Sequence, residues 1–111
     1  MAGPTTRASE REEGGLGMTE TALTAAIMAA LRTRGAWVYK AQGTAYSQAG
    51  VPDLLVGYQG RFIALEVKLP GERATPRQEW VMGRIRAAGN VAVVVHSVEE
   101  ALATALRGSP L

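Results

Sequence analysis

Three charged residues lie at a spacing that can build a hydrolytic metal site: Asp53, Glu66 and Lys68. Glu66 and Lys68 are two residues apart in an apolar segment, so on a β-strand both side chains point to one face. Asp53 follows Pro52 at the start of the preceding apolar segment, and proline suits the first residue of a strand because it has no N–H to pair. A tight turn between the segments would gather two carboxylates and one ammonium group at one end of a hairpin.

This grouping is informative because like charges held close together repel each other and are costly to remove from water. A divalent cation between two carboxylates offsets that cost, and a neighbouring lysine can orient or activate a water molecule. Carboxylates, a metal ion and a lysine are the parts that metal-assisted phosphodiester hydrolysis needs. The same spacing also fits a cross-strand salt bridge between solvated strand ends, with Asp53 as a turn residue, and spacing alone leaves both interpretations open.

Composition limits the chemistry of such a site. The 111 residues include no cysteine and one histidine, which excludes thiol catalysis, Cys-ligated zinc and a multi-histidine site within one chain. Metal ligands must then be mainly oxygens, which favours Mg²⁺ or Mn²⁺. No apolar run has the roughly 18 residues of a membrane helix, and the N-terminal stretch has no signal-peptide pattern. We therefore expect a cytoplasmic protein that does not enter a membrane.

The distribution of charge bears on the partner. From residue 18 onward the chain has ten Lys or Arg and seven Asp or Glu. Setting aside the candidate site acids Glu20, Asp53 and Glu66 leaves ten basic residues against four acidic ones. Such a surface suits a phosphate backbone, although scattered arginines also simply keep a protein soluble.

The first helix is indicated by Leu23, Ile27 and Leu31, which recur at helical spacing and predict a helix over about residues 19–34. Glu20 lies three residues before Leu23 and so falls on the inward stripe of this helix. Two explanations of this carboxylate are open: favourable placement at a helix N-terminus, or a position that points into a site.

The remaining segments predict strands at 36–40, 53–58, 61–68 and 91–95, with a loop at 41–50 and a tight turn at Gln59–Gly60. Thr75, Pro76 and Gln78 mark the start of a helix that runs to about residue 88, and a last helix begins at Ser97. The order α-β-β-β-α-β-α predicts an α/β fold with a mixed central sheet flanked by helices. Residues 1–17 are expected to be a disordered tail, and residues 18–108 one domain.

Three sequence blocks in this order resemble the VRR-NUC domain, the virus-type replication-repair nuclease branch of the PD-(D/E)XK superfamily. They are GVPDLLV at 50–56, IALEVK at 63–68 and TPRQ at 75–78. The resemblance covers nearly all of residues 18–106. It implies a restriction-endonuclease-like αβββαβ core followed here by a C-terminal helix, and Mg²⁺- or Mn²⁺-dependent cleavage of DNA. Small stand-alone members of this family resemble Holliday-junction resolvases and act as homodimers.

The resemblance also implies roles for individual residues. Asp53 and Glu66 would ligate the metal, with the backbone carbonyl of Val67 as a further oxygen. Lys68 would position the attacking water and stabilise developing negative charge. Glu20 matches an acidic position that can complete the metal site.

Further candidates have ordinary explanations beside the functional ones. Gln78 matches the glutamine that faces the active site, but it also completes a capping box with Thr75. Lys40 could bind a phosphate, although an exposed strand end is the slightly favoured interpretation. Ser47 could let its loop approach a DNA backbone, or be ordinary loop chemistry. Arg73 and Arg77 flank a helix N-terminus, a plausible phosphate contact.

Two tryptophans and the single histidine complete the set. Trp37 and Trp80 could stack on bases, but packing in the core or at an interface is the favoured interpretation. His96 has no partner motif and is expected to be structural. No dedicated base-reading motif is visible, so recognition of DNA shape is expected over recognition of sequence.

The sequence therefore predicts a metal-dependent endonuclease that acts on branched or structured DNA, Holliday-junction-resolvase-like, as a homodimer with two sites. The alternatives are a flap, nicking or general endonuclease on the same scaffold, and a non-catalytic DNA-binding module that keeps the fold. A structural domain whose Asp/Glu/Lys trio is only an ion-pair cluster is a third possibility.

Overall fold

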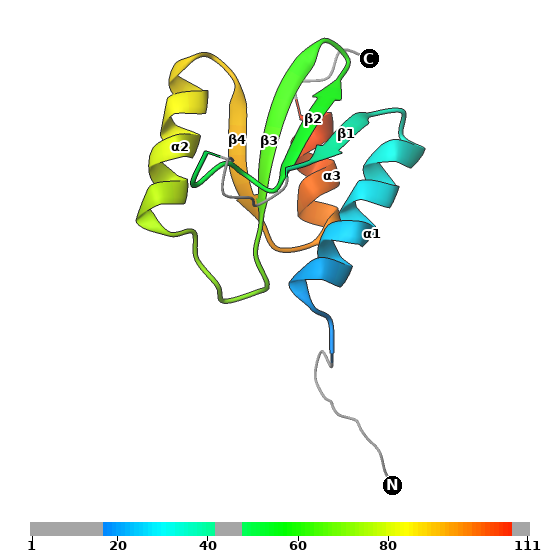
Figure 1. Cartoon of the computed structure of the whole chain (residues 1–111). Helices are drawn as coiled ribbons and strands as arrows, with labels where there is room; N and C mark the ends of the chain where they lie inside the picture. The colour runs from blue at the N-terminus through cyan, green and yellow to red at the C-terminus, as the bar shows by residue number, and fades with distance from the viewer. Residues whose placement is uncertain (1–16, 42–47, 108–111) are drawn as a thin grey trace, which may run out of the picture.

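The fold is a four-stranded sheet with three helices, as given by a computed structural model that describes residues 17–41 and 48–107 (Figure 1). The elements are α1 (Glu20–Thr33), β1 (Trp37–Lys40), β2 (Leu54–Tyr58), β3 (Arg61–Val67), α2 (Pro76–Ala87), β4 (Val91–Val95) and α3 (Val98–Leu106). The predicted α/β class and order of elements are confirmed. The predicted tail up to residue 16, the candidate Ser47 and residue 108 lie outside the described residues.

The sheet is mixed, with the strand order β1-β2-β3-β4. β1 and β3 both pair with β2 in antiparallel fashion, while β4 runs parallel to β3. A parallel pair needs a crossover connection, and α2 supplies it between β3 and β4. The sheet is thus built from a hairpin that is extended at one edge by β1 and at the other by a helical crossover.

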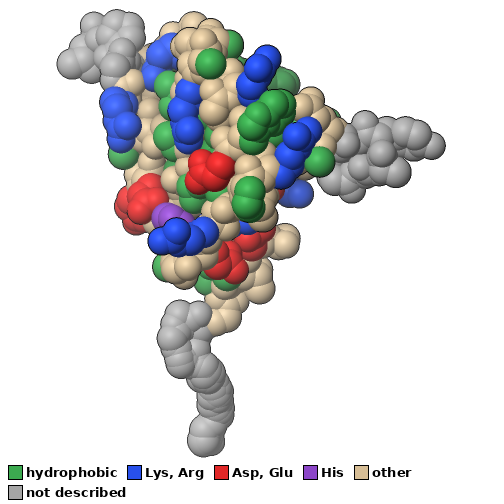
Figure 2. Space-filling view, turned by 90° about the vertical axis from the view of Figure 1, so that its left-hand side faces the viewer, with side chains coloured by type: hydrophobic (Ala, Val, Ile, Leu, Met, Phe, Trp, Pro, Cys, Tyr) green, Lys and Arg blue, Asp and Glu red, His purple; other side chains and the backbone are tan. Residues whose placement is uncertain are grey.

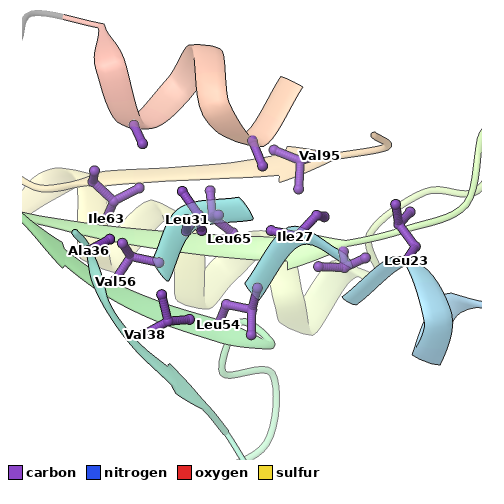
Figure 3. Packing of buried hydrophobic residues seen from close by; sticks show 13 residues of the cluster. Leu23, Ile27, Leu31, Ala36, Val38, Leu54, Val56, Ile63, Leu65 and Val95 are labelled. Atoms are coloured by element: carbon purple, nitrogen blue, oxygen red, sulfur yellow. The ribbon is translucent and has the colours of Figure 1, made fainter. Parts of the chain in front are cut away.

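Helices cover the two faces of the sheet unequally, with α1 and α3 on one side and α2 alone on the other (Figure 1). On the α1 and α3 side, Ile63 and Leu65 of β3 pack against Ile27 and Leu31 in the larger core cluster (Figure 3). Ala64, on the α2 side, belongs to a small cluster with two other buried residues, Met82 and Ala92.

Burial of alternate residues fixes the register of β3. Each large aliphatic side chain taken out of water contributes about 1.5–3 kcal/mol, and Ile63 and Leu65 have no exposed surface. A slip of one residue would turn this apolar set over and bring Glu66 into the apolar layer. The core therefore decides which face receives the charged residues of the strand.

Capping residues set the helix boundaries close to those predicted. The Thr19 and Ser97 hydroxyls accept hydrogen bonds from the Ala22 and Glu100 amides, both at 3.0 Å, which satisfies amides that a helix start leaves unpaired. The strand limits differ slightly from prediction: residue 53 precedes β2 and residue 68 follows β3. Among the described residues, no helix combines the length and apolar character needed to span a membrane.

Gly50 lies close to the first turn of α2. Its φ of +83° is in the left-handed region, and a Cβ atom built there would lie 2.9 Å from the backbone oxygen of Arg77. Such a distance is shorter than real Cβ contacts, so only glycine fits both the conformation and the approach. The loop that leads into β2 therefore depends on a residue without a side chain to pack against α2.

We expect Gly50→Ala to lower the free energy of unfolding by about 2–4 kcal/mol, because backbone strain at positive φ adds to the clash with α2. Gly60→Ala is the matched control, since Gly60 has a φ of +79° but nothing within 4 Å of an added Cβ. It should lose only about 1–2 kcal/mol. Urea denaturation of both variants checks this, and equal losses would show that the contact between Gly50 and α2 is unimportant.

Candidate active site

The hairpin register places Asp53 opposite Glu66. The β2–β3 ladder runs from Tyr58↔Arg61 to Leu54↔Leu65, and the next position pairs residue 53 with residue 66. A two-residue turn makes Tyr58 and Arg61 a hydrogen-bonded pair, so residues 53 and 66 fall at a non-hydrogen-bonded position. Cα atoms at such positions are only about 4.5 Å apart, and their side chains approach most closely. The two carboxylates therefore meet on the α2 side of the sheet.

Pro52 and Asp53 interrupt the backbone hydrogen bonds between β2 and β3. The interruption lies beside the Val67 carbonyl, which was predicted to bind the cation. Asp53 Oδ2 accepts a hydrogen bond from the Val67 amide at 2.9 Å. In a hydrogen-bonded antiparallel pair the N–H and C=O of one residue point to the same neighbour, so the Val67 carbonyl also points toward β2. There Pro52 has no N–H to donate to it. The predicted carbonyl ligand is thus directed to the side on which Asp53 lies.

Glu66 is the buried carboxylate of the site, with 2% of its surface exposed. Its Oε2 accepts a hydrogen bond from Gln78 Nε2 at 3.0 Å and lies 3.7 Å from Lys68 Nζ. Among the described residues, no group forms a hydrogen bond with its Oε1, which is buried. Burial, followed by repulsion from Asp53, raises the pKa of Glu66 to about 8.

These residues fit a hard divalent cation. An unpartnered buried oxygen beside a second carboxylate is costly unless a proton or a cation satisfies it. Among the residues that the structure describes, no three His, Cys, Asp or Glu side chains group closely enough to hold a metal. A cation here would therefore have Asp53, Glu66 and the Val67 carbonyl as protein ligands, with water completing its shell, as Mg²⁺ commonly does.

Gln78 makes both kinds of contact that the sequence left open. Its Oε1 accepts from the Thr75 amide at 2.8 Å, and its own amide donates to Thr75 Oγ1 at 3.1 Å, which makes the predicted capping box. Its Nε2 meanwhile donates to Glu66. One side chain thus starts α2 and orients the buried carboxylate.

His96 holds the backbone that carries Lys68. The parallel register pairs Val67 with Val95, so the next residues of both strands lie side by side. His96 Nδ1 is 3.2 Å from the carbonyl oxygens of both Lys68 and Leu69, and because both atoms are acceptors the geometry assigns the ring proton to Nδ1. The structural role predicted for His96 is borne out by these contacts, but its link to Lys68 depends on strand pairing that the sequence did not specify.

Glu20 lies close enough to Asp53 for the two charges to interact. The prediction that it falls on the inward stripe of its helix is wrong: it is exposed, because α1 begins at this residue and its buried stripe starts at Leu23. Partial burial, then the charge of Asp53 and contact with Glu72, raise the pKa of Glu20. Its carboxylate is thus within electrostatic reach of the site, and its role in completing a metal shell remains a prediction.

The candidate phosphate contacts occupy different positions. Lys40 pairs with Leu54, so its side chain leaves the sheet on the α1 side, opposite to Glu66. Arg73 and Arg77 are exposed near the start of α2, and Arg77 Nε donates to the Ala49 carbonyl at 3.3 Å. The structure therefore groups the two arginines with α2 and does not bring Lys40 to the carboxylates.

Both tryptophans are exposed, at 63% for Trp37 and 52% for Trp80. The favoured expectation was packing in the core or at an interface, and its core alternative is wrong within this chain. Trp37 is on the edge strand β1, and Trp80 is on α2 outside the buried residues Val81 and Met82 of that helix. Packing at an interface between chains stays a prediction.

Comparisons with known proteins agree with this fold. No family model matches the chain, and no curated protein sequence does. A solved structure described as a VRR_NUC domain matches with a TM-score of 0.66 and 25% identity, over 77% of this chain and 91% of that one. The chain has the VRR-NUC fold. A VRR_NUC domain protein gives a TM-score of 0.68 at 20% identity, over 84% of this chain and 93% of that one.

A more distant neighbour of this VRR-NUC-like chain is Hjc of Archaeoglobus fulgidus, described as a Holliday junction resolvase from an archaeal hyperthermophile. It matches with a TM-score of 0.55 and 22% identity, over 69% of this chain and 67% of that one. The resemblance inferred from the three sequence blocks is thus confirmed at the level of the fold.

The raised pKa of Glu66 makes metal-free stability depend on pH. The ordinary value is 4.5 and the folded value about 8, so between these pH values the folded state binds more protons than the unfolded state. The contribution of Glu66 to the free energy of unfolding is complete below pH 4.5 and is lost as the pH rises toward 8. The loss amounts to at most about 1.4 kcal/mol per unit of pH. We expect urea denaturation in EDTA to show this decline in wild type and not in Glu66→Gln.

Glu99→Gln, at an exposed position on α3, is the control and should keep the wild-type pH slope. Equal slopes in wild type and Glu66→Gln would contradict the account of Glu66 as the buried, proton-binding carboxylate.

Proposed function

We propose that this chain is a Mg²⁺- or Mn²⁺-dependent endonuclease that hydrolyses DNA phosphodiester bonds. The observation that carries the proposal is the buried, unpartnered oxygen of Glu66 beside Asp53 and Lys68. A structural ion-pair cluster would satisfy its own charges, whereas this one leaves an oxygen to be satisfied by something else. The structural neighbours, which are VRR_NUC domains and a Holliday junction resolvase, support a nuclease.

A divalent cation held by Asp53, Glu66 and the Val67 carbonyl would supply Lewis-acid polarisation of the scissile phosphate. Lys68 would orient the attacking water and stabilise the negative charge that grows on the phosphate oxygens. Gln78 keeps the Glu66 carboxylate in place through its hydrogen bond. Positioning of the Lys68 backbone by the His96 ring completes the support of the reacting groups.

The proposed substrate is branched or structured DNA, cut by a homodimer. Paired cuts in a four-way junction need two sites, and one small domain carries one, so a two-fold dimer supplies the second. The description of Hjc as a Holliday junction resolvase supports this substrate. A panel that includes a four-way junction, a flap, a nicked duplex and plain duplex separates this proposal from a flap, nicking or general endonuclease.

Cleavage should depend on the carboxylates and on the lysine. We expect wild type to cut the four-way junction in Mg²⁺ or Mn²⁺, Asp53→Asn to have no detectable activity, and Lys68→Ala to be slower by about 100-fold or more. Glu99→Gln, at an exposed position on α3 and not among the residues assigned to the site, should cut like wild type. Equal rates in all four proteins, or no cutting of any DNA in the panel with either metal, would rule out the proposed function.

Metal should also stabilise the folded protein. A ligand at 100 times its dissociation constant adds about 2.7 kcal/mol when it binds only the folded state, so we expect the melting temperature at pH 8 to rise in Mg²⁺ or Mn²⁺. Asp53→Asn should lose this response and Glu99→Gln should keep it. No response in wild type would favour a structural ion-pair cluster, and a response without cleavage would favour a DNA-binding module.

A further inference from the structure

Four large aromatic side chains are exposed on the α2 side of the sheet. They are Trp37 at 63%, Trp80 at 52%, Tyr39 at 49% and Phe62 at 40%. Contiguous exposed apolar surface of this kind marks an interaction site, because single exposed apolar residues are ordinary and gathered ones are not. These four residues are called the aromatic band below.

The members of the band are neighbours in space. Trp37 and Phe62 both pair with Gly57, one from each side, and the absence of a side chain at Gly57 leaves the surface between them open. The rings of Trp37 and Tyr39 are nearly parallel, with centroids 6.1 Å apart. Phe62 lines one hollow with Trp37 and a second with Trp80. The band therefore continues from the edge strand β1 across β3 to α2.

Positive charge accompanies the band at α2. The guanidinium carbon of Arg77 is 4.7 Å from the Trp80 ring centroid and that of Arg84 is 5.7 Å from it, because residues three and four apart share one face of a helix. Figure 2 looks onto this side of the molecule, where basic and hydrophobic side chains adjoin in the upper half, one acidic group lies in the middle of the face and others lie lower down. Exposed aromatic rings and positive charges therefore lie side by side on this surface.

We propose that the aromatic band binds unpaired bases of a DNA strand by stacking, while Arg77 and Arg84 contact its phosphates. Bases and phosphates alternate along a nucleic-acid strand, and both chemistries are present in the band. Fully paired bases hide their faces in the duplex, so stacking selects DNA with unpaired nucleotides, as at a branch or a gap. This inference rests on the proposed function, because it names the part of the substrate that lies beside the cleavage site.

Charge argues against a second copy of the chain as the occupant. A two-fold contact centred on Trp80 would bring Arg77 and Arg84 of both copies together, and like charges placed across an interface oppose association. A phosphate backbone has the opposite charge and would be attracted instead. The electrostatics therefore favour nucleic acid over self-association.

The band is connected to the candidate active site through α2. Gln78 donates to Glu66 at 3.0 Å, and Trp80 follows two residues later on the same helix. The helix therefore contacts the carboxylates on its inner side and presents Trp80 on its outer side. A strand stacked on Trp80 would therefore lie against the same helix that contacts Glu66.

The test compares two oligomers of equal length and charge. One is a 12-residue oligodeoxythymidylate, and the other has abasic residues throughout, so only the first can stack. Binding is measured by fluorescence anisotropy in EDTA, which removes any need for cleavage. We expect wild type to bind the base-bearing oligomer about tenfold more tightly, Trp80→Ala to lose most of that preference, and Trp80→Phe to keep most of it.

Leu106→Ala is the matched control, because Leu106 is an exposed apolar residue on α3, on the other side of the sheet. It should keep the tenfold preference. Thermal melting within a few degrees of wild type for each variant separates lost stacking from lost folding. In Trp80→Phe the remaining Trp37 also reports directly, since its fluorescence should be quenched by the thymidylate oligomer and not by the abasic one.

Equal binding of the two oligomers by wild type would overturn the inference, since phosphates alone would then explain the affinity. Concentration-dependent dimerisation that Trp80→Ala abolishes, with no base preference, would assign the band to a second copy instead. Failure of the proposed function gives a different result. A preference for the base-bearing oligomer in EDTA, with no cleavage of any DNA in Mg²⁺ or Mn²⁺, would support stacking on the aromatic band and rule out the nuclease.

Discussion

Repulsion between two carboxylates that the backbone forces together is the constraint on which this site depends. Asp53 and Glu66 face each other because the turn and the buried residues of β3 fix the hairpin register. Neither residue can move away without turning Ile63 or Leu65 out of the core. The folding energy of the apolar layer thus holds together two acids that would separate in a flexible chain, and the result is affinity for a proton or a cation at this position.

The surrounding residues act on this pair in different ways. Pro52 ends the ladder, which leaves the Val67 carbonyl without a partner from that residue, while Gln78 and Lys68 contact one oxygen of Glu66 and leave the other unsatisfied. His96 fixes the Lys68 backbone from the neighbouring strand. Each contact comes from a different element, so the sheet and α2 must form before the site exists.

Local patterns predicted the fold well and tertiary placement less well. The capping residues and apolar periods gave every described helix and strand to within one or two residues, because these signals act over a few positions. The burial of Glu20 was predicted wrongly because the spacing of apolar residues does not show where a helix extends beyond the sheet. The exposure of Trp80 and the link between His96 and Lys68 depend on which elements become neighbours, which no local pattern contains.

The most direct test of the central claim is a crystal structure of the protein soaked in Mn²⁺ at pH 8, with anomalous scattering used to locate the ion. The account predicts one Mn²⁺ between Asp53 and Glu66, bound at about 2.2 Å by a carboxylate oxygen of each and by the Val67 carbonyl oxygen. Side chains that point to opposite faces of the sheet, or an anomalous peak only at other positions, would contradict it.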